Sequence, residues 1–155
     1  MRVEYINPFV EAAFNVLKEV LDADVKRGDL YLKSTTMSIM GVAALVGLAG
    51  DVEGRVLFDM TKQTALSVAG AMNSEEFTQL DDMAKATITE LANMITAQAV
   101  TKLHDLGFKF DLTPPALFSG ENMEISNQEV EALIVPMELG PHGKIEINVA
   151  IRERT

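Results

Sequence analysis

Apolar positions recur along the chain at two spacings, and the alternation between these spacings predicts both helices and strands. Spacings of three and four residues indicate a first helix over residues 8–21. We expect Pro8 in its first turn and Asn7 as its cap. The apolar stripe of this helix consists of Phe9, Ala13, Val16, Leu17 and Val20.

The segments between and after the helices have the composition of strands. Residues 30–37 favour strands, and the nearly apolar run 42–48 is typical of a strand covered on both faces. A turn over 50–54 leads into 55–60, which predicts a hairpin. Further strands are expected over residues 108–112, 123–126 and 131–137, with a polar turn near Asn127–Gln128.

The last strand has a strict two-residue period. Ile145, Ile147, Val149 and Ile151 alternate with Glu146, Asn148, Ala150 and Arg152. One face of the sheet is therefore expected to be apolar here and the other wetter.

Two further helices lie in the middle of the chain. Thr61 is expected to cap a short helix that ends near Met72. A long helix is expected over 78–106, with Thr78 and Asp81 as a capping box and Gly107 as its stop. The order of elements predicts an α+β fold, with helices packed on a mainly antiparallel sheet, in one domain over 1–155.

Composition narrows the classes of function. The net charge of −10 argues against nucleic acid as a partner and disfavours an acidic membrane surface. The chain has no cysteine and no apolar signal core at its start, so we expect a cytoplasmic protein. His104 and His142 have no carboxylate at ligand spacing, and no metal site is expected.

The pattern Glu-x-x-Asn occurs three times, as Glu4/Asn7, Glu90/Asn93 and Glu124/Asn127. The first pair precedes the predicted helix start, and the last falls on a strand and its turn. Only Glu90 and Asn93 are expected inside a helix, where residues three apart are neighbours at about 5–6 Å. This pair is the candidate site.

A helical wheel gives the direction of that pair. The predicted core face consists of Leu80, Met83, Ala84, Thr87, Leu91, Met94, Ile95 and Gln98. Glu90 and Asn93 fall outside that face, with Ala86, Thr89 and Ala97 on or beside the same exposed surface. Physics alone leaves two interpretations open. The pair belongs to an ordinary solvated helix face, or it serves a group that another molecule brings close.

The order of motifs resembles the CheC/CheX family of chemotaxis phosphatases. The sequence 90–94, ELANM, is followed by 111–115, DLTPP, and then by Ser119-Gly120. The segments 47–54, 64–66, 71–72 and 80–82 fit the same family pattern. With one active helix the chain is closer to CheX, because Glu11 and Asn15 are one residue too far apart. Ala86 departs from the family, which often has Ser or Asp there.

The resemblance implies a phosphatase that acts on the aspartyl phosphate of a CheY-type response-regulator receiver. Asn93 would hold the attacking water and Glu90 would pair with the receiver lysine. Ala86, Thr89 and Ala97 would contact the partner. The chain would need no cofactor, since Mg²⁺ belongs to the receiver. A homodimer is expected, with the edge at 131–137 as its interface. The alternative is a non-catalytic module that binds a receiver or a flagellar-switch protein.

Overall fold

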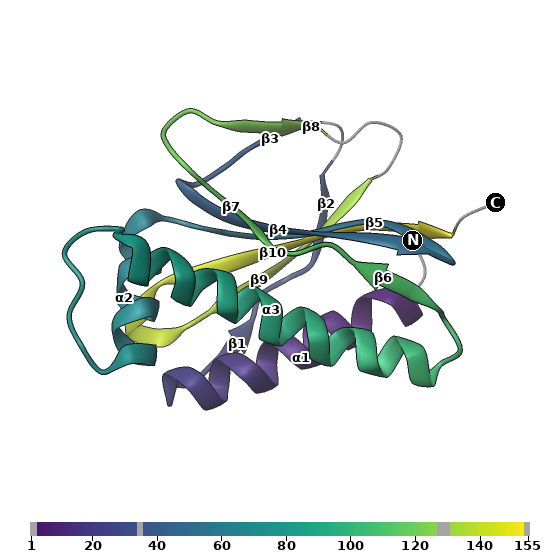
Figure 1. The fold of residues 1–155 in the computed structure, drawn as a ribbon, viewed down its shortest axis with the longest axis horizontal. Helices are drawn as coiled ribbons and strands as arrows, with labels where there is room; N and C mark the ends of the chain where they lie inside the picture. The colour runs from purple at the N-terminus through teal and green to yellow at the C-terminus, as the bar shows by residue number, and fades with distance from the viewer. Residues whose placement is uncertain (1–2, 34–35, 127–130, 154–155) are drawn as a thin grey trace.

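The computed structural model describes residues 3–33, 36–126 and 131–153 as an antiparallel sheet with helices on one face (Figure 1). The α+β prediction is confirmed. The helices are α1 (Val3–Leu21), α2 (Lys62–Asn73) and α3 (Asp82–Asp105). The strands are β1 (Lys26–Arg27), β2 (Tyr31–Lys33), β3 (Thr36–Ser38), β4 (Val42–Gly50), β5 (Val52–Met60), β6 (Phe110–Leu112), β7 (Ala116–Ser119), β8 (Glu124–Ser126), β9 (Ala132–Glu138) and β10 (Lys144–Glu153).

Helix α1 begins earlier than its sequence predicted. Pro8 lies inside the helix, so the predicted start with Asn7 as cap is wrong. Tertiary packing explains the extra turn, because Tyr5 and Ile6 are 2% and 5% exposed and extend the apolar stripe. The Tyr5 ring also packs edge-on against Phe108, with centroids 5.0 Å apart.

The caps of α2 and α3 differ in how well the sequence predicted them. Thr61 caps α2 as expected, since its hydroxyl accepts the Thr64 N–H at 3.1 Å. The predicted capping box of α3 is wrong, because Asp81 is itself the cap and accepts the Ala84 N–H at 2.9 Å. Helix α3 therefore starts four residues later than expected, and it ends just before Gly107, which has φ +98°.

The main sheet has the strand order β1-β9-β10-β5-β4-β6, with β2 also paired to β9 and β7 also paired to β4. The predicted hairpin is the β4–β5 pair. The prediction of a free edge at 131–137 is wrong, because β9 pairs with β10 on one side and with β1 and β2 on the other. Strand β2 lies within the strand segment predicted over 30–37, whereas β1, with two residues, was not predicted.

The second face of the sheet is covered, which agrees with the prediction for residues 42–48 but not with the wetter face expected for the last strand. The short sheet β3–β8 lies over the face opposite the helices (Figure 1). On β10 the isoleucines and Val149 face the helices and are buried, as expected. Glu146 and Asn148 on the other face are 8% and 0% exposed rather than wet. The predicted turn at Asn127–Gln128 lies outside the described residues, as do Ser34 and Thr35 of the strand predicted over 30–37.

Candidate functional site on helix α3

Helix α3 holds the two candidate side chains in a fixed relation. It packs against α1, α2 and β4, and its buried residues include Ile88, Leu91 and Ile95. Glu90 and Asn93 are exposed, so the predicted outward direction of the pair is correct. A carboxylate and a carboxamide one helical turn apart thus project from a backbone that tertiary packing fixes on its other side.

The exposed side of α3 is a continuous row, here called the α3 stripe. It consists of Met83, Ala86, Glu90, Asn93, Ala97 and Thr101, all exposed. At 1.5 Å per residue it is about 27 Å long. Glu90 is its one charged member. A partner's backbone can therefore approach most of its length without meeting a long charged side chain.

Part of the predicted core face of α3 is wrong. Met83 is 56% exposed and Gln98 is also exposed, whereas Ile88, Ala92 and Ala99 are buried. Seven residues make almost two full turns, so Met83 lies only about 20° from Glu90. That phase was available from the sequence and would have placed Met83 on the stripe. Thr87 does point inward, and its hydroxyl accepts from Asn73 Nδ2 at 2.8 Å.

The hydroxyl groups on or beside the stripe are bonded to the helix itself. Thr89 is half-buried and donates to the Lys85 carbonyl at 2.8 Å, and Thr101 donates to the Ala97 carbonyl at 3.0 Å. Within residues 3–33, 36–126 and 131–153, the Glu90 and Asn93 side chains have no hydrogen bond or ion pair. Their polar atoms are thus available to a group that comes from outside.

The other Glu-x-x-Asn pairs need a new assessment. Glu4 and Asn7 lie inside α1 and are exposed, so their predicted position before a helix is wrong. Helix geometry alone therefore does not single out Glu90 and Asn93. Glu124 is exposed at the start of β8, and Asn127 lies outside the described residues.

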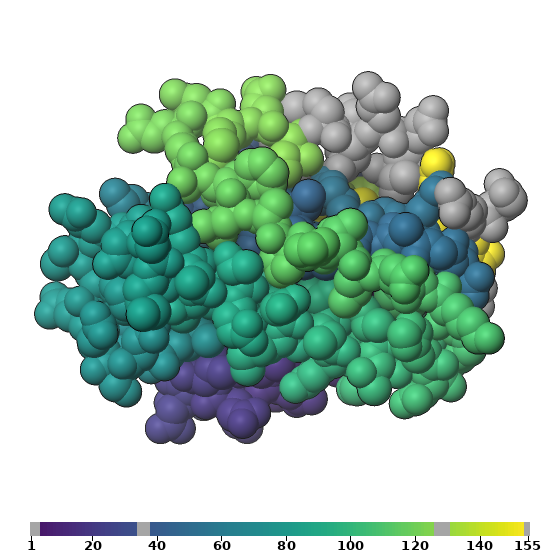
Figure 2. Space-filling view, in the orientation of Figure 1, coloured from purple at the N-terminus to yellow at the C-terminus, as the bar shows by residue number. Residues whose placement is uncertain are grey.

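The segment that carries Pro114 and Pro115 is fixed to the sheet beside α3. Thr113 donates its backbone N–H to the Gly47 carbonyl at 2.9 Å, and its hydroxyl accepts the Gly47 N–H at 2.8 Å. A Cβ on residue 47 would come within 3.0 Å of the Thr113 methyl group, so glycine permits this approach. In Figure 2 this segment borders the surface of α3.

A groove lies beside the first turns of α3. It has a volume of about 920 Å³ and is lined in part by Met40, Lys62, Leu80, Lys85 and Asn122.

The histidines take part in local structure. His104 Nε2 lies 3.3 Å from the Phe110 carbonyl, and His142 Nδ1 lies 2.6 Å from the Ser67 hydroxyl. Among the described residues no three His, Cys, Asp or Glu side chains gather as metal ligands. A membrane-crossing helix is also not found in that part of the chain.

The fold and the stripe define a class of protein: an α+β domain whose long surface helix carries an exposed carboxylate and carboxamide without a bonding partner among the described residues. The model of the family described as chemotaxis phosphatase CheX matches residues 42–138. The chain belongs to this family, and its resemblance to CheC/CheX proteins is confirmed. The matched range includes all of α3.

Three known proteins illustrate the relationship. The CheY-P phosphatase CheX of Thermotoga maritima is 27% identical over 98% of each chain. The crystal structure of the CheX–CheY–BeF₃–Mg²⁺ complex from Borrelia burgdorferi contains a chain 49% identical, with TM-score 0.86, over 98% of this chain and 100% of that one. A CheC-like superfamily protein from Shewanella is 28% identical, with TM-score 0.89, over 98% and 99%.

Proposed function

We propose that this protein hydrolyses the aspartyl phosphate of a CheY-type receiver domain. Membership of a family described as chemotaxis phosphatases supports the reaction class. The names of two relatives, a CheY-P phosphatase and a complex with CheY, support the substrate class. The observation that carries the assignment to residues is the exposed, unpaired Glu90/Asn93 pair on a stripe without other charges.

Asn93 holds the attacking water in this proposal. A carboxamide donates and accepts hydrogen bonds, so it can fix both the position and the orientation of one water. Phosphoryl transfer depends mostly on positioning and charge neutralisation. A water held in line with the phosphoryl group removes much of the entropic barrier. The small neighbour Ala97, one turn away, leaves Asn93 free to enter the receiver's site.

Glu90 sets the register of the complex in this proposal. Its carboxylate pairs with the lysine of the receiver's active site, one helical turn from the water that Asn93 holds. Ala86, Thr89 and Ala97 contact the receiver surface around this pair. The Mg²⁺ that neutralises the phosphoryl group is the receiver's own, and the chain itself contributes no cofactor.

We also propose a homodimer, with its surface on β2 rather than on β9. Among the described strands β2 pairs with β9 alone, so its other side is open. Leu30 and Leu32 beside and on this strand are 39% and 61% exposed. Leu32→Lys is expected to turn the dimer into a monomer in sedimentation experiments. A wild-type protein that sediments as a monomer would contradict this part.

The test of the function mixes the protein with a phosphorylated receiver and follows both complex formation and phosphate loss. We expect wild type to accelerate the loss, Asn93→Ala to bind without acceleration, and Glu90→Ala to weaken both. Binding by wild type without acceleration would instead support the non-catalytic interaction module. A wild type that neither binds nor accelerates would contradict both functions.

A further inference from the structure

A second set of polar side chains, separate from the α3 stripe, lies on the face of the sheet opposite the helices. Asp59 on β5 and Glu146 on β10 are register partners on adjacent antiparallel strands, so their side chains stand side by side on one face. Asp59 is 0% exposed and Glu146 is 8% exposed. Two carboxyl groups are thus buried next to each other, which is costly when both are ionised.

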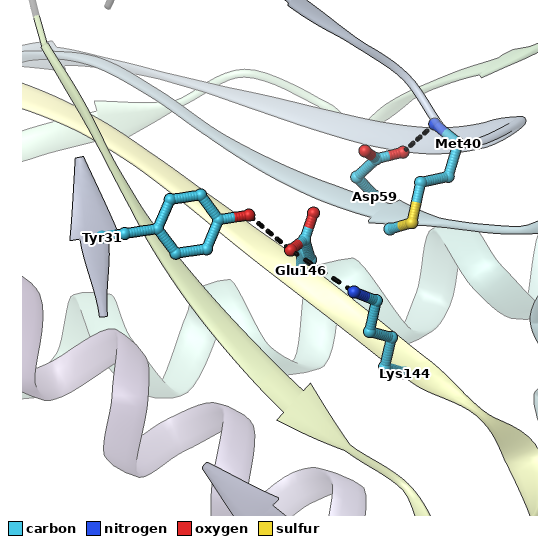
Figure 3. Close-up of polar contacts among 5 residues, drawn as sticks. All are labelled: Tyr31, Met40, Asp59, Lys144 and Glu146. Atoms are coloured by element: carbon cyan, nitrogen blue, oxygen red, sulfur yellow. Dashed lines mark hydrogen bonds and ion pairs between the residues drawn. The ribbon is translucent and has the colours of Figure 1, made fainter. Parts of the chain in front are cut away.

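The hydrogen bonds of the pair leave one oxygen unused. Asp59 Oδ1 accepts the Met40 N–H at 3.0 Å, and Glu146 Oε2 accepts the Tyr31 hydroxyl at 2.6 Å (Figure 3). Asp59 Oδ2 is buried and has no hydrogen-bond partner in the part of the chain that the structure describes. Figure 3 places it on the Glu146 side of the Asp59 carboxyl group. A buried carboxyl oxygen without a partner is unfavourable unless it carries a proton or meets a cation.

Positively charged side chains lie near the pair, but none in the described part of the chain bonds to Asp59 Oδ2. Lys144 on β10 approaches Glu146 Oε2 at 3.8 Å and is itself half exposed. Lys33 on β2 acts on Asp59 from a distance. Arg55, on the same face of β5, bonds to Asn148 at 3.2 Å. The nearest described residue from β4, Ala43, and those from the β3–β8 layer, Met123 and Ile125, are apolar.

We propose that Asp59 and Glu146 form a binding site for one shared proton, which bridges Asp59 Oδ2 and the Glu146 carboxylate. The bridge would satisfy the unused oxygen and remove the like-charge repulsion in one step. A proton fits better than a metal ion, because the pair offers only two carboxyl ligands and the Tyr31 and Lys144 donors already approach Glu146 Oε2. The shared proton would connect two segments, since the N–H of Met40, which lies between β3 and β4, and the hydroxyl of Tyr31 on β2 bond to the two carboxyl groups.

The electrostatics of Asp59 agree with this geometry. The pKa of Asp59 is raised from 3.8 to about 6, with burial as the largest cause and the Glu146 charge adding to it, while the Met40 and Met60 N–H groups and Lys33 act to lower it. The proton is therefore held up to about pH 6 and lost above it.

The experiment is a carbon-13 NMR titration of the Asp59 carboxyl group in the whole protein between pH 5 and pH 8. The resonance is assigned by its loss in Asp59→Asn. We expect a midpoint near pH 6 in wild type, a lower midpoint in Glu146→Gln, and a higher one in Tyr31→Phe, which removes a donor to the Glu146 anion. Asp29→Asn, which changes an exposed carboxyl group before β2, is the matched control and should leave the midpoint unchanged.

Three results would overturn the proposal. A wild-type midpoint below pH 5 means that Asp59 ionises as an ordinary carboxyl group. A midpoint near pH 6 that neither Glu146→Gln nor Tyr31→Phe moves means that burial alone holds the proton, without sharing. A resonance that shifts on addition of Mg²⁺ or Ca²⁺ at pH 7.5 means that the pair is a cation site. The wild-type titration and the metal addition remain decisive if either substitution prevents folding.

Discussion

Helices α1 and α3 lie side by side on one face of the sheet, and both present a glutamate to solvent at mid-helix. On α1 this residue is Glu11, which forms an ion pair with Lys102 of α3. The positions three and seven residues after Glu11 are Phe14 and Lys18, both exposed, and the Lys18 ammonium lies 5.7 Å from the Phe14 ring centroid. On α3 the corresponding spacing gives Glu90, Asn93 and Ala97, with no described partner for the two polar groups.

The difference between the helices is the basis for proposing α3, and not α1, as the docking surface. On α1, Glu11 and Lys18 interact within the chain. The two polar groups of α3 are unpaired in the described structure and have small neighbours. The motif Glu-x-x-Asn occurs on both helices, as Glu4/Asn7 and Glu90/Asn93. The motif alone does not distinguish the helices, and our proposal for α3 rests on the small neighbours of its unpaired polar groups.

The largest effect on activity is expected from Asn93 on α3 and not from Asn7, the asparagine of the same motif on α1. Asn93→Ala should reduce acceleration of receiver dephosphorylation by about 10²-fold or more, because loss of a group aligned with the transition state typically costs this much. Asn7→Ala on α1 is the matched control and should keep the wild-type rate. Equal losses in the two variants would remove the distinction between the helices.

A bulky charge on the stripe is expected to have the next largest effect. Ala97→Arg should raise KM for the phosphorylated receiver at least tenfold, equivalent to about 1.4 kcal/mol of binding, because the side chain occupies space that the partner needs. Asn15→Arg places the same charge on the exposed side of α1 and should leave KM unchanged. Impaired binding in Asn15→Arg, with normal binding in Ala97→Arg, would contradict the proposal that α3 and not α1 contacts the receiver.

Removal of the α3 carboxylate should have a smaller effect than either change. Glu90→Ala should weaken receiver binding by about tenfold, within the range for one partner of a charge pair at an interface. Glu11→Ala, which breaks the ion pair with Lys102, should leave binding intact and change stability by at most about 1 kcal/mol, since both groups are exposed. Isothermal titration with the receiver and thermal unfolding measure the two effects.

The smallest effect on catalysis is expected from Asp59, on the opposite face of the sheet. Its pKa of about 6 exceeds the ordinary 3.8, so the native state binds this proton more tightly than the unfolded state. The stability that the proton provides is complete below about pH 4 and is lost as the pH rises through 6. Between pH 5 and 7.5 the free energy of unfolding therefore falls by about 1.4 kcal/mol, the energy that corresponds to one pKa unit.

Asp59→Asn should remove that part of the pH dependence and unfold at a higher temperature than wild type at pH 7.5, while its dephosphorylation rate stays unchanged. Calorimetry at pH 5 and 7.5 measures the first effect. An unchanged pH slope would show that Asp59 does not bind this proton, and a lost dephosphorylation rate would show that Asp59 also affects the site on α3.

The sequence predicted those parts of the fold whose signals are local. Thr61 as a cap, the β4–β5 hairpin and the strict alternation of β10 follow from neighbouring residues alone. The start of α1 depends instead on burial of Tyr5 and Ile6 by distant segments. The cover over Glu146 and Asn148 comes from β3 and β8, which lie largely within segments predicted as strands. Their pairing joins residues far apart in the sequence, so no local pattern indicates that they lie over this face.

The sequence predicted that the candidate site faces outward, but not all the residues of the exposed stripe. The outward positions of Glu90 and Asn93 follow from helix phase, and the same phase would have placed Met83 on the stripe. That Glu4 and Asn7 also lie on a helix could not be predicted, because Pro8 is a strong local signal for a helix start. Tertiary packing against α3 and the sheet overrides this signal.

The rate constant of phosphate loss from a phosphorylated receiver, measured with the phosphatase at saturating concentration, tests the central claim most directly. Saturation removes differences in affinity, so the rate reports only the chemical step. Wild type is predicted to accelerate the loss, and Asn93→Ala to bind the receiver yet leave the loss at the receiver's own rate. An Asn93→Ala variant that, once saturating, matched the wild-type rate would contradict the claim that α3 supplies the group that positions the water.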